Sequence, residues 1–171
     1  FIQDSKKRAD NDMTLADAIR NSPAEIVLGY FFHMNEADLD YDIEQSEIDR
    51  QLKRISASKY PFVLYEAEGA DFVPFIRAYA PVSNLEILTD VAASSGYFTL
   101  RSDQDGVLRW MPLAIQYGDD MFPPLSVLCA WHYLDEPQLM VKVGRYGVQG
   151  IQMGDRFIPT DESGQLLINY L

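Results

Sequence analysis

The stretch Arg156-Phe-Ile-Pro-Thr-Asp-Glu-Ser-Gly-Gln-Leu-Leu-Ile-Asn-Tyr170 decides the fold, because it closes a run of short strands separated by turn residues. The pattern predicts four strands with glycine-containing turns between them, at 139–144, 147–153, 156–159 and 166–171. Upstream, the alternating segments 97–101 and 107–111 flank Asp103-Gln-Asp-Gly106. Asp-Gly between such segments favours a hairpin, because glycine accepts a positive φ at little cost. The C-terminal half is therefore expected to be an antiparallel hairpin region.

The N-terminal half predicts a helix followed by a buried strand. The helix is expected over residues 11–20, capped by Asn11 or Asp12, with three side chains on one face, namely Leu15, Ala18 and Ile19. The apolar run 25–32 predicts a strand that is buried on both faces, as is typical of a sheet covered by helices. A short strand is also expected within 72–81.

Three more helices are predicted. Ser46-Glu-Ile-Asp49 resembles a capping box and opens a helix over 46–58, with three apolar residues at helical spacing, Ile48, Leu52 and Ile55. Another helix is expected from Asn84 to Ser95, with Gly96 in left-handed backbone just beyond its end. Pro123-Pro124 favours the start of a further helix, whose stripe would contain Leu125, Leu128, Cys129 and His132.

Length and composition predict one globular domain. The chain has 171 residues, of which 47% are hydrophobic and 23% charged, and no repeat or low-complexity linker divides it. The expected fold is mixed α/β, with a helix-covered mixed sheet and a C-terminal antiparallel hairpin region in a single domain over 1–171. A helical first half packed on a separate β-hairpin layer is the alternative.

Charge and hydropathy exclude several classes of partner. The net charge of −12 disfavours binding to nucleic acids and anionic lipids, and the basic cluster Lys6-Lys7-Arg8 is diluted by neighbouring aspartates. No apolar stretch of about 18 residues and no apolar leader is present, so these residues are not expected to span a membrane or to act as a signal peptide. The single cysteine, Cys129, excludes an internal disulfide and leaves the redox compartment open.

No residue pattern predicts catalysis, a metal or a cofactor. The acidic run 36–49 lacks the glycine of an EF-hand calcium loop and is interpreted as a solvated acidic loop. Cys129 and His132, with His33 elsewhere, do not complete a zinc ligand set, and core packing is the simpler interpretation of both. Asp103 and Asp105 are expected to be solvent-facing turn residues.

Two further arrangements are rejected. Ser126 and His132 lie six residues apart, on different helix faces, so they form no catalytic pair. The glycines at 144, 147, 150 and 154 lack the Lys-Ser/Thr ending of a phosphate loop and are interpreted as strand turns.

The order of several short motifs resembles a known family. In the second half these motifs are Ser94-Ser-Gly-Tyr-Phe98, Asp103-Gln-Asp-Gly-Val107 with Arg109, Pro112-Leu113, Pro124-Leu125-Ser126, Ile158-Pro-Thr-Asp161, Gly164 and Ile168-Asn-Tyr170. In the first half they are Leu15-Ala-Asp-Ala-Ile19, Ile26-Val-Leu-Gly-Tyr-Phe-Phe32 and Ala78-Tyr-Ala-Pro81. As a series they resemble the bacterial type-two CHASE domain, the cyclases/histidine kinases associated sensory extracellular domain. One departure is Ser102, where the family usually has proline.

The resemblance implies a non-catalytic extracytoplasmic sensory domain of an inner-membrane receptor. Such a receptor would carry a cytoplasmic nucleotide cyclase, a diguanylate cyclase or a kinase, and Tyr30-Phe-Phe-His33 and Ser56-Ala-Ser-Lys-Tyr-Pro61 favour an adenylate or guanylate cyclase. Family members usually begin with a membrane helix and further strands, so the chain is expected to be N-terminally incomplete. The implied partners are an unknown small-molecule or protein signal and a second copy in a homodimer, with flanking membrane helices as the tether. No ligand-binding residue is implied.

Two other hypotheses stay open. The first is a dimerisation or interaction module of a receptor, which would have a large apolar interface and no pocket with converging polar groups. The second is a soluble enzyme that uses carboxylates within 36–49, which would need at least one raised carboxylate pKa in a cleft. Arg77 and Arg109 lie in apolar strand contexts, and each is expected to face the surface or to be ion-paired.

Overall fold

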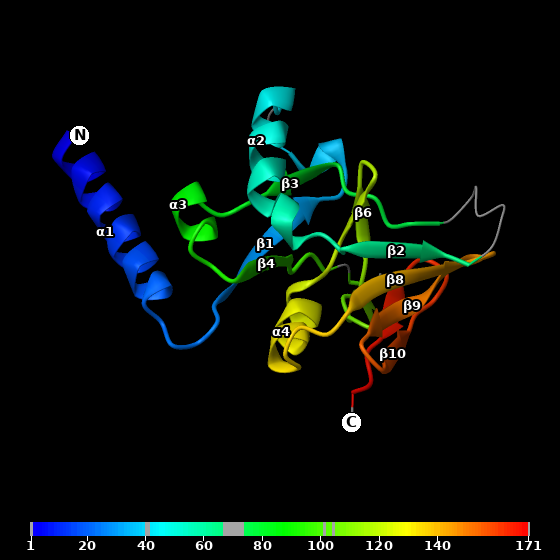
Figure 1. The fold of residues 1–171 in the computed structure, drawn as a ribbon. Helices are drawn as coiled ribbons and strands as arrows, with labels where there is room; N and C mark the ends of the chain where they lie inside the picture. The colour runs from blue at the N-terminus through cyan, green and yellow to red at the C-terminus, as the bar shows by residue number, and fades with distance from the viewer. Residues whose placement is uncertain (1, 40–41, 67–73, 101, 104, 171) are drawn as a thin grey trace.

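The structure is a computed structural model that describes residues 2–39, 42–66, 74–100, 102–103 and 105–170, with residues 2–10 as backbone only (Figure 1). Its helices are α1 (Ile2–Arg20), α2 (Gln45–Ile55), α3 (Glu86–Thr89) and α4 (Leu125–Tyr133), with short 3₁₀ turns at Glu36–Asp38 and Ser56–Ser58. Eleven strands form two larger sheets and two small antiparallel pairs, so the predicted mixed α/β class is confirmed.

The first sheet has the order β3-β1-β4 and is built on the apolar run of the N-terminal half. Strand β1 (Val27–His33) lies in the centre, antiparallel to β3 (Ala80–Val82) and parallel to β4 (Ser94–Tyr97). Tyr30 and Phe32 are buried on one face, whereas Phe31 between them is half-buried. The predicted strand is thus confirmed, with one face more completely covered than the other.

The second sheet has the order β10-β9-β8-β2 and contains the predicted C-terminal strands. Strands β8 (Leu139–Gly144), β9 (Gly147–Met153) and β10 (Arg156–Pro159) form an antiparallel meander with the expected bounds. Strand β2 (Phe62–Tyr65) joins it parallel to β8, although it comes from the first half of the chain. Figure 1 shows β2 extending away from α2 to lie along β8.

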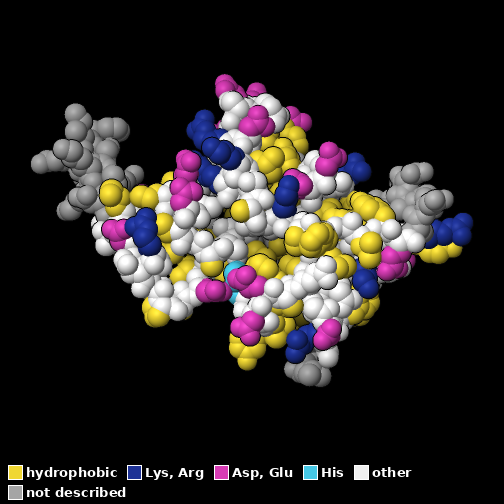
Figure 2. Space-filling view, viewed as in Figure 1, with side chains coloured by type: hydrophobic (Ala, Val, Ile, Leu, Met, Phe, Trp, Pro, Cys, Tyr) yellow, Lys and Arg dark blue, Asp and Glu magenta, His cyan; other side chains and the backbone are white. Residues whose placement is uncertain are grey.

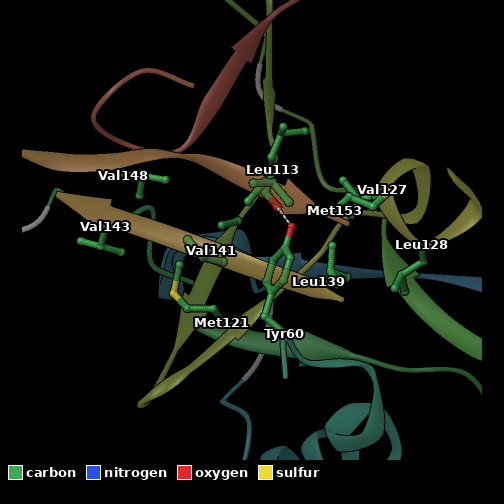
Figure 3. Packing of buried hydrophobic residues seen from close by; sticks show 12 residues of the cluster. Tyr60, Leu113, Met121, Val127, Leu128, Leu139, Val141, Val143, Val148 and Met153 are labelled. Atoms are coloured by element: carbon green, nitrogen blue, oxygen red, sulfur yellow. Dashed lines mark hydrogen bonds between the residues drawn. The ribbon is translucent and has the colours of Figure 1, made fainter. Parts of the chain in front are cut away.

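A hydrophobic core lies between the second sheet and α4. Alternate residues of β8 and β9 are buried in it, including Val141, Val143, Ile151 and Met153. The ring of Tyr60 enters this cluster, and its hydroxyl donates a hydrogen bond of 2.7 Å to the Leu113 carbonyl (Figure 3). A second cluster packs side chains of the first sheet against residues from other elements. Its members are Tyr30, Phe32, Ile55, Tyr97, Ile115 and Phe122.

The predicted hairpin around Asp103–Gly106 is wrong, although its turn forms. The Gly106 amide donates to the Asp103 carbonyl and the Asp103 amide to the Val107 carbonyl, and Gly106 has a φ of 79°. The flanking segments then separate, because β4 pairs with β1, and β5 (Trp110–Pro112) pairs with β11 (Gln165–Leu167). Each flanking segment thus pairs with a strand that is distant in sequence, and the two do not pair with each other. The prediction also included Arg101, which lies outside the described residues.

The predicted helix from Asn84 to Ser95 is mostly wrong. Only α3 (Glu86–Thr89) forms, and Ser94–Tyr97 is β4. Gly96 is therefore not in left-handed backbone beyond a helix. A side chain on Gly96 would meet the Leu125 Cα and backbone N at 2.6 Å, so glycine is needed there for the close approach of α4.

The other three predicted helices form, but some of their ends, caps and buried residues differ from the prediction. Helix α1 continues N-terminally to Ile2, so the predicted cap is wrong. Within residues 11–20 the buried residue is Ala16, whereas Leu15 and Ala18 are exposed. Helix α2 begins at Gln45 after Glu44 and lacks the predicted capping box, since no side chain caps its first turn. Helix α4 begins directly after Pro124, as predicted.

Two predicted strands are shorter than expected. In the segment 72–81 the ladder involves only Ala80–Val82, and residues 72 and 73 lie outside the described part. In the segment 166–171 the strand is Gln165–Leu167, and Leu171 is not described. The remaining antiparallel pair, β6 (Ile115–Tyr117) with β7 (Asp120–Phe122), forms a tight hairpin around Gly118, which has a φ of 58°.

Candidate functional site

An apolar groove of about 770 Å³ opens between β4, the first turns of α4, β5 and the C-terminal segment. We call it the α4 groove. Its lining residues come from four separate parts of the chain: Tyr97, Phe98, Leu100, Met111, Leu113, Leu125, Ser126, Cys129, Leu166, Leu167, Ile168 and Asn169. Tertiary packing alone brings these segments together, because they span residues 97 to 169.

Hydrogen bonds fix the walls of the α4 groove. The hydroxyl of the fully buried Tyr97 donates to the Pro112 carbonyl at 2.7 Å, which joins the end of β4 to β5. The Ile168 amide donates to the Arg109 carbonyl at 2.7 Å, and the Tyr170 hydroxyl donates to the carbonyl of Leu108. The C-terminal segment is thus held against β5 as one wall.

The chemistry of the α4 groove suits an apolar ligand or surface. Phe98, Leu100 and Leu167 are about half exposed, which leaves apolar area in contact with water. Its lining residues with polar side chains are Ser126, Asn169, Cys129 and Tyr97, whose hydroxyl is bonded to the Pro112 carbonyl. The volume lies in the range of small-molecule pockets, about 300–1,000 Å³, and such pockets are mainly apolar. Cys129 is exposed at this groove, so its interpretation as a core cysteine is wrong.

The turn aspartates form a surface ion pair with Arg109. The Arg109 guanidinium donates to Asp103 at 2.7 Å and to both carboxylate oxygens of Asp105 at 2.7 and 3.0 Å. The hydrogen bonds from Arg109 and from the Val107 amide lower the pKa of Asp105, and the two aspartates raise the pKa of Arg109. A general acid needs a raised pKa, so this cluster is structural. Of the two expectations for Arg109, a surface position or an ion pair, the structure shows the ion pair.

Arg77 faces the surface, as expected. It lines a small polar hollow of about 290 Å³ together with Gln116 and Asp119, and its backbone forms an isolated bridge with Gln116. A second hollow, of about 280 Å³ and with a mixed polar and apolar lining, lies beside Lys53 and Arg54 of α2 and the residues of α3.

The acidic run 36–49 consists of cap and helix-surface residues where it is described. Asp38 accepts backbone hydrogen bonds from Asn35 and Met34 at 3.0 and 2.9 Å, and these bonds lower the pKa of Asp38. Glu47 pairs with Arg50 at 3.0 Å on α2. Figure 2 shows acidic side chains around the upper end of α2, facing outward. This agrees with a solvated acidic surface; Asp40 lies outside the described residues.

His132 contacts residues that the sequence did not indicate. Its Nε2 lies 2.8 Å from the Ser94 hydroxyl, and its Nδ1 lies 2.7 and 2.9 Å from carboxylate oxygens of Glu25 and Glu136. Ser126 does not take part, as expected. Glu136, four residues after His132, was a local signal for this cluster, whereas Ser94 and Glu25 are brought there only by folding.

The comparisons with known proteins identify a family. A sequence model of the CHASE2 domain matches residues 3–171, nearly the whole chain. Neither the search of curated proteins nor that of solved structures found a match. In the described part of the chain, each helix is too short or too polar to cross a bilayer. The resemblance seen in the ordered motifs is confirmed, and the chain belongs to the CHASE2 family of extracellular sensory domains.

Proposed function

We propose that this domain detects an external signal and regulates a cytoplasmic output, a nucleotide cyclase, across the inner membrane. The match of the CHASE2 model to residues 3–171 supports the sensory role. The cyclase rests on the resemblance of Tyr30-Phe-Phe-His33 and of residues 56–61 to cyclase-linked members. The domain itself carries out no chemistry in this proposal.

The α4 groove is the proposed site of detection. It combines a ligand-sized volume with apolar walls from β4, α4, β5 and the C-terminal segment. Helix α4 packs on β1 and β4, and β1 follows α1 in the chain. A ligand that binds one arrangement of these elements more tightly would shift their population by its differential affinity, and the shift would reach the membrane through the chain ends.

A variant of the parent receptor tests this proposal. Ser126→Trp would fill the α4 groove with an indole, whereas Ala130→Trp adds the same bulk at an exposed position of α4 outside the groove. In cells that express the full receptor, cyclic AMP and cyclic GMP are measured for the wild type and both variants. We expect Ser126→Trp to change the output several-fold and to abolish its response to stimuli, with Ala130→Trp close to wild type. Equal outputs from all three receptors, or no cyclic nucleotide at all, would contradict the proposal.

A dimerisation module is the second candidate, and the exposed apolar residues of the groove favour it. Phe98, Leu100 and Leu167 could be covered by a second copy instead of a small molecule. Sedimentation of the isolated chain separates the two candidates. A dimer that Ser126→Trp dissociates and Ala130→Trp leaves intact would support the interaction module. A monomer that is thermally stabilised by an apolar compound would support the ligand site.

A further inference from the structure

Outside the α4 groove, three metal-ligating side chains converge at the C-terminal end of α4. The Nδ1 of His132 and one carboxylate oxygen each of Glu25 and Glu136 all lie within 4.8 Å of one another. Glu25 precedes β1, whereas His132 and Glu136 belong to the last turn of α4 and to the turn after it. The cluster therefore joins segments that are more than 100 residues apart in sequence.

His132 is the buried member of this cluster. Its side chain is 8% exposed, whereas those of Glu25 and Glu136 are 59% and 48% exposed. The Nδ1 atom is shielded from solvent and has no hydrogen-bond partner among the described residues, although the two carboxylate oxygens lie at 2.7 and 2.9 Å. The two contacts are therefore ion-pair distances and do not count as hydrogen bonds.

The other ring nitrogen supports a role for Nδ1 as a ligand. Nε2 lies 2.8 Å from the Ser94 hydroxyl, which can accept its proton in a hydrogen bond. In that tautomer Nδ1 carries no proton, and its lone pair is available to a cation. A metal-binding histidine usually donates a hydrogen bond from its other ring nitrogen in this way, which holds the ring in place. Three electron-rich atoms within 4.8 Å of one another repel, and a cation between them would offset this repulsion.

The backbone after α4 positions Glu136 and adds negative potential. The amides of Asp135 and Glu136 donate to the carbonyls of His132 and Trp131, and both residues have positive φ, 60° and 53°. This turn folds Glu136 back over the imidazole. The C-terminal end of a helix carries a partial negative charge, so the site attracts cations. Among the described residues, the only ion-pair partner of either glutamate is His132.

We propose that Glu25, His132 and Glu136 bind a divalent transition-metal ion, with Zn²⁺ as the best fit. Imidazole nitrogen suits Zn²⁺, whereas Ca²⁺ and Mg²⁺ take oxygen ligands. Tetrahedral Zn²⁺ with ligands at about 2.1 Å places donor atoms about 3.4 Å apart. The distances from His132 Nδ1 to the two carboxylate oxygens therefore need to increase by roughly half an ångström. The carboxylates are exposed and can move by this amount. Water completes the coordination on the solvent side.

The bound ion ties the segment between α1 and β1 to the end of α4. Figure 1 shows α1 set apart from the sheets and joined to β1 by this segment. The metal thus restricts the path that leads from α1 into the first sheet. This inference does not depend on the α4 groove or on a cyclase output, so either proposal can fail without the other.

Zinc binding by the purified chain tests the inference. Binding is measured by competition with a chromophoric chelator, and bound metal is counted after dialysis. We expect one Zn²⁺ per chain, no displacement by millimolar Mg²⁺ or Ca²⁺, and the visible spectrum of a tetrahedral site on Co²⁺ substitution. Zn²⁺ should also raise the melting temperature of the wild type. Failure to bind Zn²⁺ would overturn the proposal.

The variants locate the site. Glu25→Gln and Glu136→Gln keep side-chain size at exposed positions, so both variants should fold normally. Each should weaken Zn²⁺ affinity at least 10- to 100-fold, because the loss of a residue that only supports a metal ligand already has an effect of this size. Asp135→Asn removes a charge next to the site, and Cys129→Ser removes the thiol of α4, another group that could bind Zn²⁺. Both variants should bind Zn²⁺ with wild-type affinity. Wild-type affinity in the two glutamine variants, or loss of binding in Cys129→Ser, would assign the metal elsewhere and overturn the proposal.

Discussion

Three buried tyrosines differ in what their hydroxyl groups contact. Those of Tyr60 and Tyr97 each donate a hydrogen bond of 2.7 Å to a buried carbonyl, that of Leu113 or Pro112. The hydroxyl of Tyr30 is buried and has no hydrogen-bond partner among the described residues. A phenylalanine at each position would keep the ring packing and remove only the hydroxyl, so the three positions form a matched set.

Tyr60→Phe and Tyr97→Phe should each lower the free energy of unfolding by about 1–3 kcal/mol, because a buried carbonyl loses its partner. Tyr30→Phe should be neutral or slightly stabilising, because it removes an unsatisfied buried hydroxyl. Urea unfolding at neutral pH measures all three. An equal loss in all three variants would mean that the hydroxyl contacts do not determine the difference.

The contact between β4 and α4 depends on one glycine of a neighbouring pair. Gly29 of β1 and Gly96 of β4 are partners in the parallel ladder. A Cβ at Gly96 would meet the backbone of Leu125 at 2.6 Å, whereas a Cβ at Gly29 would meet the Phe98 ring at 2.8 Å. The ring is half exposed and can move, but the helix backbone cannot move without displacing α4.

Gly96→Ala should therefore destabilise the chain by about 1–3 kcal/mol or more, as overpacking does. Gly29→Ala should cost less than about 1 kcal/mol, because ring movement and the lower entropy of the unfolded chain offset the clash. Thermal unfolding of both variants, with the groove residues monitored by NMR, checks this. A larger cost for Gly29→Ala would show that α4 adjusts more easily than Phe98.

The buried tyrosines also give the whole molecule a pH dependence. Burial raises the pKa of Tyr30, Tyr60 and Tyr97 above the ordinary value of 10.0. Below pH 10 these tyrosines are protonated in both states, and their contribution to stability is complete. Above pH 10 the unfolded chain loses these protons while the folded chain keeps them, so stability falls as pH rises.

Each such tyrosine should reduce the free energy of unfolding by a little over 1 kcal/mol per pH unit above pH 10. Tyr30→Phe should make this slope shallower without loss of stability at neutral pH. This change would assign part of the slope to Tyr30, because lysines that titrate in the same pH range are unaffected by the substitution. Urea midpoints between pH 8 and pH 11.5 measure the slope. Identical slopes for the wild type and Tyr30→Phe would contradict the assignment.

The sequence by itself determined the family, the fold class, β1 and the meander of β8, β9 and β10. These strands have strong local patterns: a continuous apolar run or alternating residues bounded by glycine. In the meander the partner of each strand is also its neighbour in sequence, so local residues specify both the strand and its partner. The sequence also identified Asp103–Gly106 as a turn and predicted that Arg109 would face the surface or be ion-paired. Both depend on residues within a few positions of each other.

Tertiary structure alone decided the pairing of β4 with β1, β2 with β8 and β5 with β11, and it decided both candidate sites. The α4 groove needs residues from 97 to 169, and the cluster at His132 needs Glu25 and Ser94. Gly96 shows why these were not predictable: the same residue suits a helix end or a close strand–helix contact. Local propensities differ by less than the free energy gained when distant apolar surfaces are buried together, so long-range packing overrides them.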